Sequence, residues 1–223
     1  MDKFMFNERF GLQSAAIDGT KTDTRRIEKS LAVLPTELGE GEYMIPHLEN
    51  DRFIVRKYWK GALLDTYTIV PRFKVGDVVA IAQRYSEFLL FNHAVMEKGK
   101  QTTAGTTKGW NNKMFVKAEL MPNRVEITNV RLQRLQDISD EDCLHEGIKE
   151  HYPYVKWNPN DKLKSYRFRD KKSKYGYYQL SPVRDCFAEF INRVSGKGTW
   201  ERNPWVLAYS FKRIENNGQE SKE

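Results

Sequence analysis

The chain has 223 residues, of which 39% are hydrophobic and 13% aromatic, enough to build one domain with a sizeable core. Its 37 Lys and Arg exceed its 30 Asp and Glu, and this net charge of +7 favours an anionic partner, nucleic acid first. The absence of a long apolar run predicts no membrane span, while a charged N-terminal segment and only two cysteines predict a protein of the reducing cytoplasm.

The N-terminal part of the chain is expected to contain one helix, followed by a polar segment. Asn7 is a candidate cap for a helix over residues 8–18, and Gly19 can end that helix in the left-handed conformation. Residues 28–50 lack a clear period and are expected to form an irregular connection.

Alternating apolar residues and turn signals predict most of the remaining elements. The expected elements are a hairpin turning at Lys60-Gly61, a strand over 78–82 after a Gly76-Asp77 turn, a polar loop over 97–113, a strand over 114–120 pairing with a long bulged strand over 124–135, a helix capped by Ser139 and closed by Gly147, a helix over 182–194 and a closing strand over 204–214. This pattern predicts an α+β fold, a small, partly open β-barrel with helices outside it. We expect a single domain over 1–215 and a disordered tail over 216–223.

Familiar site motifs are missing. The chain has no Walker A, GxGxxG, HExxH, GxSxG or CxxC sequence. This argues against phosphate-binding loops, zinc sites and hydrolases with a nucleophile elbow. The histidines, at positions 47, 93, 145 and 151, show no ligand spacing. The sequence therefore predicts neither a metal nor a cofactor.

The segment GTKTDTRRI, residues 19–27, offers a candidate base and nucleophile. Desolvation of Lys21 would lower its pKa toward the range of a general base, able to take the proton of the Thr24 hydroxyl. Arg25 and Arg26 would then bind a phosphate or a carbonyl oxygen. The alternative is a polar loop that only packs the helix exit.

Glu146 is the second candidate. It lies at the end of the helix in SDEDCLHEGI, where a carboxylate opposes the helix dipole, and such a misfit can indicate acid–base function. The alternative is a solvated surface glutamate.

The third candidate is the basic segment KLKSYRFRDKKSKYGYY, residues 162–178, with seven Lys or Arg and five Tyr or Phe. Interleaved cations and rings suit a single-stranded nucleic acid, and Lys171, Lys172, Lys174 and Tyr175 are the expected contacts. The alternative is a solvated hairpin. By contrast, Trp200, Trp205, Phe211, Cys143 and Cys186 are expected in the core.

Several motifs, in order along the chain, resemble the ASCH domain family, whose fold is a PUA-like β-barrel. The opening matches that family at Phe6, Arg9, Phe10, Gly19, Lys21, Thr22, Thr24 and Arg26, and the later matches are FKVGDVVAI, VEITNVRLQRLQDISDEDCLHEGI and NPWVLAYSFKRI. Together they cover roughly half of the chain, and phage and prophage members look most similar.

The resemblance implies a function related to RNA or modified nucleosides. One bacterial branch of the family hydrolyses N4-acetylcytidine to cytidine and acetate, and its motif positions match Lys21 as proton acceptor, Thr24 as nucleophile and Glu146 as proton donor. This chain departs from that branch by extra segments over 28–72, 88–112 and 149–180, and by Gln83 where related members carry a glutamate. A non-catalytic protein that binds RNA or single-stranded nucleic acid is the alternative.

Overall fold

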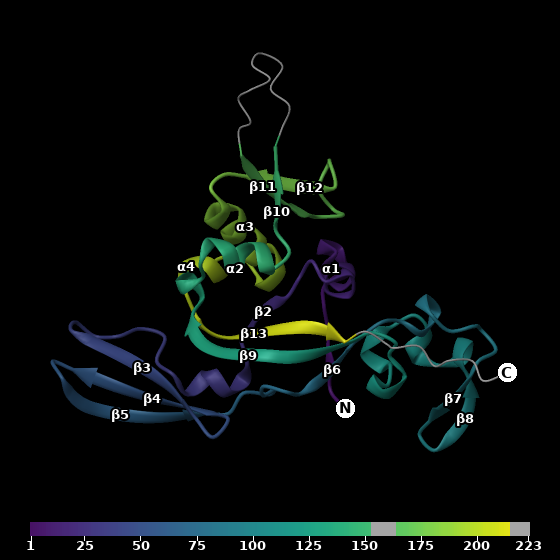
Figure 1. Cartoon of the computed structure of the whole chain (residues 1–223), viewed down its shortest axis with the longest axis horizontal. Helices are drawn as coiled ribbons and strands as arrows, with labels where there is room; N and C mark the ends of the chain where they lie inside the picture. The colour runs from purple at the N-terminus through teal and green to yellow at the C-terminus, as the bar shows by residue number, and fades with distance from the viewer. Residues whose placement is uncertain (153–163, 215–223) are drawn as a thin grey trace, which may run out of the picture.

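The structure, a computed structural model, describes residues 1–152 and 164–214. It is a mixed α+β protein that is mostly β and holds several sheets (Figure 1). The main sheet has five strands in the order β1 (Lys3–Phe4), β6 (Val78–Ile81), β9 (Arg124–Arg134), β13 (Trp205–Ile214) and β2 (Asp23–Arg26). β1 and β6 are parallel, and every other pair in this sheet is antiparallel.

The long pair β9–β13 is the centre of that sheet, and its bulge is visible in the spacing of apolar residues. Val125 and Ile127 are buried, and then Val130 and Leu132 are buried, so the inward parity changes between Ile127 and Val130. The register of β9 against β13 shifts at the same place, between Ser210 and Phe211. The extra residue in β9 shifts the alternation of side chains by one position, so that Val130 and Leu132 face the core again. The predicted long bulged strand is confirmed.

Four α-helices lie to one side of β9 and β13 (Figure 1): α1 (Leu12–Asp18), α2 (Asp140–His145), α3 (Val183–Ser195) and α4 (Thr199–Arg202). The buried residues of α3 recur at helical spacing and give it one apolar stripe: Val183, Cys186, Phe187, Phe190 and Ile191. α2 begins where the Ser139 side chain accepts a hydrogen bond from the amide of Asp142, at 3.1 Å. Both predicted helices are confirmed.

The first predicted helix is divided in two. A 3₁₀ turn, η1 (Glu8–Phe10), precedes α1, and Gly11 separates them with a φ of 68°. A side chain at Gly11 would place its Cβ 3.1 Å from Cδ of Arg169, so backbone conformation and space both favour glycine. Asn7 caps η1, and Gly19 ends α1 with a φ of 81°, as the sequence predicts.

Three smaller sheets extend from this centre (Figure 1). They are β3 (Glu42–Glu49), β4 (Arg52–Trp59) and β5 (Ala62–Ile69); β7 (Ala94–Glu97) and β8 (Lys100–Thr103); and β10 (Lys149–His151), β11 (Ser165–Arg169) and β12 (Tyr177–Leu180). The predicted turn at Lys60-Gly61 is confirmed, since both residues have positive φ between β4 and β5. The remaining short elements are 3₁₀ turns: η2 (Lys29–Val33), η3 (Tyr85–Glu87), η4 (Ala104–Thr106), η5 (Lys108–Trp110), η6 (Lys113–Phe115), η7 (Ala118–Leu120) and η8 (Leu135–Asp137).

Three predicted segments were wrong. The polar loop expected over 97–113 contains β8, which pairs with β7, and the turns η4 and η5. The expected irregular connection contains β3, an edge strand with apolar residues on both faces and Pro46 in its middle, so its sequence lacks alternation. The strand expected over 114–120 is instead η6 and η7, whose exposed Phe115 and Leu120 carry the apolar signal that suggested a strand.

The core has a main cluster and a smaller one. The main cluster packs against both faces of β13, where every residue from Trp205 to Tyr209 is buried. The smaller cluster lies within residues 80–121, which we call the lobe. Its members are Ala80, Ala82, Tyr85, Val95, Ala104, Val116, Ala118 and Met121. Trp205, Phe211 and both cysteines are buried, and Trp200 packs against the main cluster, as expected. No helix in the described part of the chain is long and apolar enough to cross a membrane.

Candidate active site

β2 presents its side chains to two different surroundings. Successive residues of a strand alternate between faces, so Asp23 and Arg25 share one face, while Thr24 and Arg26 share the other. Ala208 of β13 lies between two arginines in the sheet: it is opposite Arg25 of β2 on one side and opposite Arg131 of β9 on the other. The small side chain of Ala208 leaves room for both arginines to reach toward α2.

Lys21 and Glu146 form a buried pair where β2 meets the end of α2. The Lys21 side chain is 1% exposed, and its Nζ lies 2.5 Å from Oε2 of Glu146. Nζ also donates to the carbonyls of Asp23 at 2.6 Å and of Glu146 at 2.9 Å, so all three ammonium hydrogens have acceptors. Burial lowers the pKa of Lys21, and the Glu146 carboxylate acts in the opposite direction. The predicted residues Lys21 and Glu146 are thus brought together.

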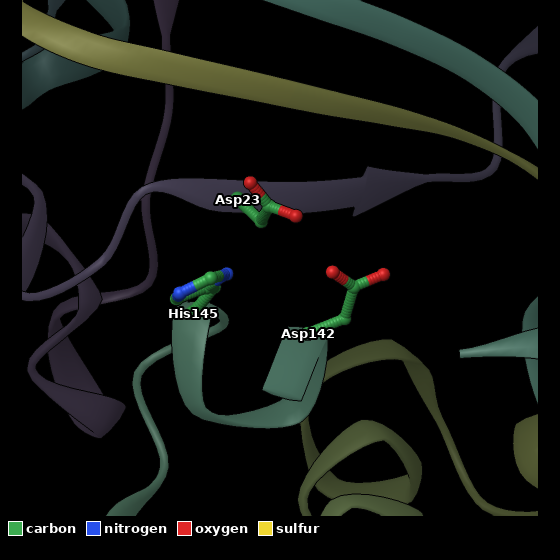
Figure 2. Close-up of side chains that lie close together, drawn as sticks. All are labelled: Asp23, Asp142 and His145. Carbon is green, nitrogen blue, oxygen red and sulfur yellow. The ribbon is translucent and has the colours of Figure 1, made fainter. Parts of the chain in front are cut away.

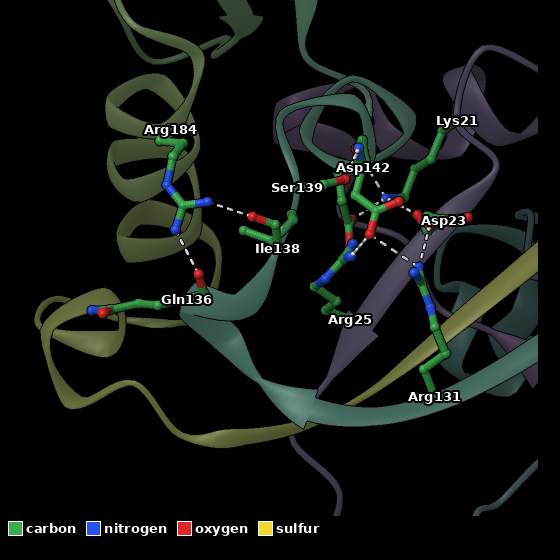
Figure 3. A network of polar contacts seen from close by, with 10 residues as sticks. Lys21, Asp23, Arg25, Arg131, Gln136, Ile138, Ser139, Asp142 and Arg184 are labelled. Atoms are coloured by element: carbon green, nitrogen blue, oxygen red, sulfur yellow. Dashed lines mark hydrogen bonds and ion pairs between the residues drawn. The ribbon is translucent and has the colours of Figure 1, made fainter.

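A wider ionic cluster surrounds this pair (Figure 3). Arg25 binds Oε1 of Glu146 at 3.1 Å and Oδ2 of Asp142 at 2.5 Å. Arg131 reaches Asp142 at 3.1 Å and Asp23 at 3.2 Å. Three cations therefore meet three carboxylates, and the charges of the cluster balance.

Sequence reasoning missed three members of the cluster: Asp23, Arg131 and Asp142. A signal existed for Asp142, because it precedes Glu146 by four residues and so shares a helix face with it. Arg25, predicted to bind a ligand, has a side chain only 1% exposed and both terminal nitrogens on carboxylates. Its position is that of a residue holding Glu146 in place.

One group in this region has the donor types of a metal site. Asp23, Asp142 and His145 bring their ligand atoms within 4.8 Å of one another (Figure 2). Arg131 already provides a cation to both carboxylates. A metal ion here would have to replace that arginine, so the donor set fits the arginine better than a metal. Burial also raises the pKa of Asp23, which disfavours its charged form.

Thr24 lines a cleft of about 490 Å³ on the other face of β2, together with Phe6, Arg26 and residues of α1 and α3. The Arg26 guanidinium lies over the rings of Phe4 and Phe6, at 4.5 and 5.7 Å. Its Nε is buried and has no hydrogen-bond partner among the described residues. The Lys21 ammonium approaches the same Phe6 ring, at 5.8 Å, so the ionic cluster borders this cleft.

The Thr24 hydroxyl is not engaged by its neighbours in the fold. The residue is 7% exposed, and within the described ranges its hydroxyl forms no hydrogen bond, to Lys21 and Glu146 or to any other residue. Direct proton transfer from Thr24 to Lys21 therefore requires a change of side-chain rotamer or a bridging water.

The predicted nucleic-acid residues lie elsewhere, in the turn between β11 and β12. Lys171, Lys172 and Lys174 are exposed there, and Tyr175 is 70% exposed with the Lys174 ammonium 5.2 Å from its ring. The start of the predicted basic segment, residues 162 and 163, lies outside the described residues, as does the tail expected over 216–223.

No protein-family model, curated protein or solved structure matches the chain.

Proposed function

We propose that the protein is an amidohydrolase that removes an acyl group from an N4-acylated cytosine nucleoside or a similar modified base. The observation that carries this proposal is the buried Lys21–Glu146 pair, 2.5 Å apart, bordering a cleft that contains a threonine hydroxyl with no hydrogen bond to the described residues. A base, an acid and a nucleophile are the groups that amide cleavage needs.

In the proposed reaction the Thr24 oxygen attacks the acyl carbonyl and Lys21 takes the hydroxyl proton. Glu146 protonates the departing amine as the C–N bond breaks, which releases cytidine and leaves an acyl ester on Thr24. Water then attacks the ester and gives one proton to Glu146, and as the bond from the acyl carbon to the Thr24 oxygen breaks, Lys21 returns its proton to that oxygen. The acyl group leaves as acetic acid, and Lys21, Thr24 and Glu146 are back in their starting states. Arg26 lines the cleft, and its Nε is buried without a hydrogen-bond partner among the described residues, so its guanidinium would stabilise the negative charge on the carbonyl oxygen.

The contact between Lys21 and Glu146 supports these two roles together. Moving one proton from the ammonium to the carboxylate gives a neutral amine, the base, and a neutral carboxyl group, the acid. Burial favours the neutral amine, since it lowers the pKa of the Lys21 ammonium. Arg25 binds the Glu146 carboxyl group, at 3.1 Å, and keeps it beside Lys21.

We further propose that the five-stranded sheet is the core of a PUA-like barrel of the ASCH type. The segments that carry the resemblance support this, because they form β2, β6, β9 with α2, and β13, all of which contribute to the main sheet or to the Lys21–Glu146 pair. The proposed ligand of the Thr24 cleft is a modified nucleoside, free or within a single strand of RNA.

The test uses Thr24, because its hydroxyl has no structural partner in the described residues. Thr24→Val removes the hydroxyl at nearly constant shape and should lower cytidine release from N4-acetylcytidine at least about 10³-fold. Thr24→Ser keeps the hydroxyl and should retain measurable turnover. Both variants should unfold at nearly the temperature of the unmodified protein, which excludes loss of fold. Full turnover by Thr24→Val, or no turnover by the unmodified protein, would refute the proposal.

A further inference from the structure

A second cleft, of about 360 Å³, lies between α1 and the sheet β10–β11–β12. Its lining includes Ser14, Asp18, Lys149, Arg167, Arg169 and Tyr177. We propose that this cleft binds the phosphate of a nucleotide unit. The inference goes beyond the amidohydrolase proposal, because it uses none of Lys21, Thr24 and Glu146 and holds whether or not the protein is catalytic.

Three basic side chains gather on the cleft side of this sheet. Lys149 of β10 lies directly opposite Arg167 of β11, and Arg169 follows two residues later on the same face. Like charges directly opposite each other destabilise a pair of strands. An anion bound between them would remove that repulsion.

No carboxylate compensates these three charges within residues 1–152 and 164–214. Lys149, Arg167 and Arg169 form no ion pair there, whereas Lys164, close by in sequence, binds Glu150 at 2.6 Å. The acid of the cleft, Asp18, uses its Oδ1 to accept hydrogen bonds from the amide and hydroxyl of Thr20, at 2.9 and 2.6 Å. The cleft therefore keeps an excess of two positive charges, three against one.

The geometry of these side chains suits a phosphate attached to a base. Two guanidinium groups can each bind phosphate oxygens through two parallel hydrogen bonds. The Arg167 guanidinium also lies 5.4 Å from the ring of Tyr177, which is 39% exposed. A ring beside a cation offers a base a surface for stacking. A nucleotide, as a monophosphate or within a single strand, meets both requirements.

Exposed lysines at two other turns provide a matched control. Replacing Lys149, Arg167 and Arg169 by Gln removes three positive charges from the cleft, and replacing Lys60, Lys98 and Lys100 by Gln removes the same charge from the β4–β5 and β7–β8 turns. A purely long-range effect of net charge would weaken RNA binding in both variants alike.

The experiment measures binding of a fluorescent single-stranded RNA by anisotropy at two salt concentrations, and of cytidine and cytidine monophosphate by calorimetry. We expect the cleft variant to bind RNA at least about tenfold more weakly and with a smaller salt dependence, while the turn variant changes less than about threefold. We also expect cytidine monophosphate to bind and cytidine not to bind at this site. Binding of RNA alone would assign the phosphate to a strand, and binding of the monophosphate as well would include free nucleotides.

Three results would overturn the proposal: equal weakening in both triple variants, no weakening in the cleft variant, or no binding of either phosphate ligand. Arg167→Lys checks the geometry separately, since it keeps the charge and removes the planar fork. That variant should fall between the unmodified protein and the triple cleft variant. Melting temperatures of all variants show that the fold is retained.

Discussion

At the residue scale, Lys21 has two roles that compete. As an ammonium group it donates three hydrogen bonds and neutralises part of a buried acidic cluster, which is a structural task. As a neutral amine it would be a base beside the Thr24 cleft. The same burial that lowers its pKa also makes its removal damaging to the fold.

We therefore predict that Lys21→Met destabilises the protein whatever its effect on catalysis. Among the described residues, removing the ammonium leaves Glu146 with Arg25 as its one cationic partner. Breaking one side of a buried pair costs about 3–5 kcal/mol. Urea unfolding measures the change. Lys29→Met, at an exposed lysine, is the control and should stay within about 0.5 kcal/mol. Equal stability of the two variants would contradict the structural role.

The sequence alone could identify Lys21 and Thr24 as a possible pair, because they are close along the chain. It could not join Glu146 to them without the family resemblance, since 125 residues separate Lys21 from Glu146. Nor could it tell that Arg25 binds carboxylates of the ionic cluster, whereas Arg26 lines the Thr24 cleft. Their difference follows from the alternation of β2, a four-residue strand too short to show a period.

At the element scale, one carboxylate fastens the β11–β12 turn to the N-terminal segment. Asp170 is fully buried and binds Arg9 of η1 through two hydrogen bonds of 2.6 Å each. The hydrogen bond from Arg9 lowers the pKa of Asp170 below its ordinary value of 3.8. This interaction therefore stabilises the fold above pH 3.8, and its contribution is lost as the pH falls through the folded-state pKa.

Asp170→Asn should lower the free energy of unfolding by about 3 kcal/mol at neutral pH. The difference from the unmodified protein should shrink as the pH falls through the Asp170 pKa, because protonation removes the same charge. Urea unfolding across a pH series measures both. Asp51→Asn removes an exposed partner of Lys74, 3.7 Å away, and should have little effect at any pH. A pH-independent loss in Asp170→Asn would contradict the assigned cause.

Elements were predictable where local chemistry decides them. Ser139 caps α2, Lys60 and Gly61 turn a hairpin, and a change of parity reveals the bulge in β9. β3 was missed because both of its faces carry apolar residues, so the period of two disappears.

At the scale of the whole molecule, the protein has two apolar clusters of different size, and we expect local stability to differ between them. The lobe over 80–121 has the smaller cluster and short 3₁₀ turns, while the main sheet has the larger one. Lys113 connects the lobe to the N-terminal segment by bonding the carbonyl of Phe6, Gln13 at 3.0 Å and Glu8 at 3.2 Å. Because the smaller cluster provides fewer buried contacts, we expect the lobe to open locally without unfolding of the main sheet.

Native-state hydrogen exchange should therefore be faster in residues 94–121 of the lobe than in β9 or β13. Lys113→Gln removes one of the charged connections between the lobe and the N-terminal segment, and should speed exchange in the lobe about tenfold, with little change in β9. Lys117→Gln, at an exposed lysine of the same lobe, should leave both rates unchanged. Equal exchange rates in the lobe and β9 of the unmodified protein would mean that the two clusters open as one unit. Mass spectrometry of peptides from each region reads out the rates.

The order of strands in the main sheet could not be predicted from local sequence patterns, because it joins strands that are far apart along the chain. This order has a consequence for the synthesis of the protein. β2 is an edge strand whose neighbour in the sheet is β13, about 180 residues further along the chain. While the ribosome is still making the middle of the protein, the Thr24 strand has no partner for its backbone hydrogen bonds. The sheet around the proposed active site can therefore close only after β13 has left the exit tunnel, so nascent chains stalled before that point should be folded in part and inactive.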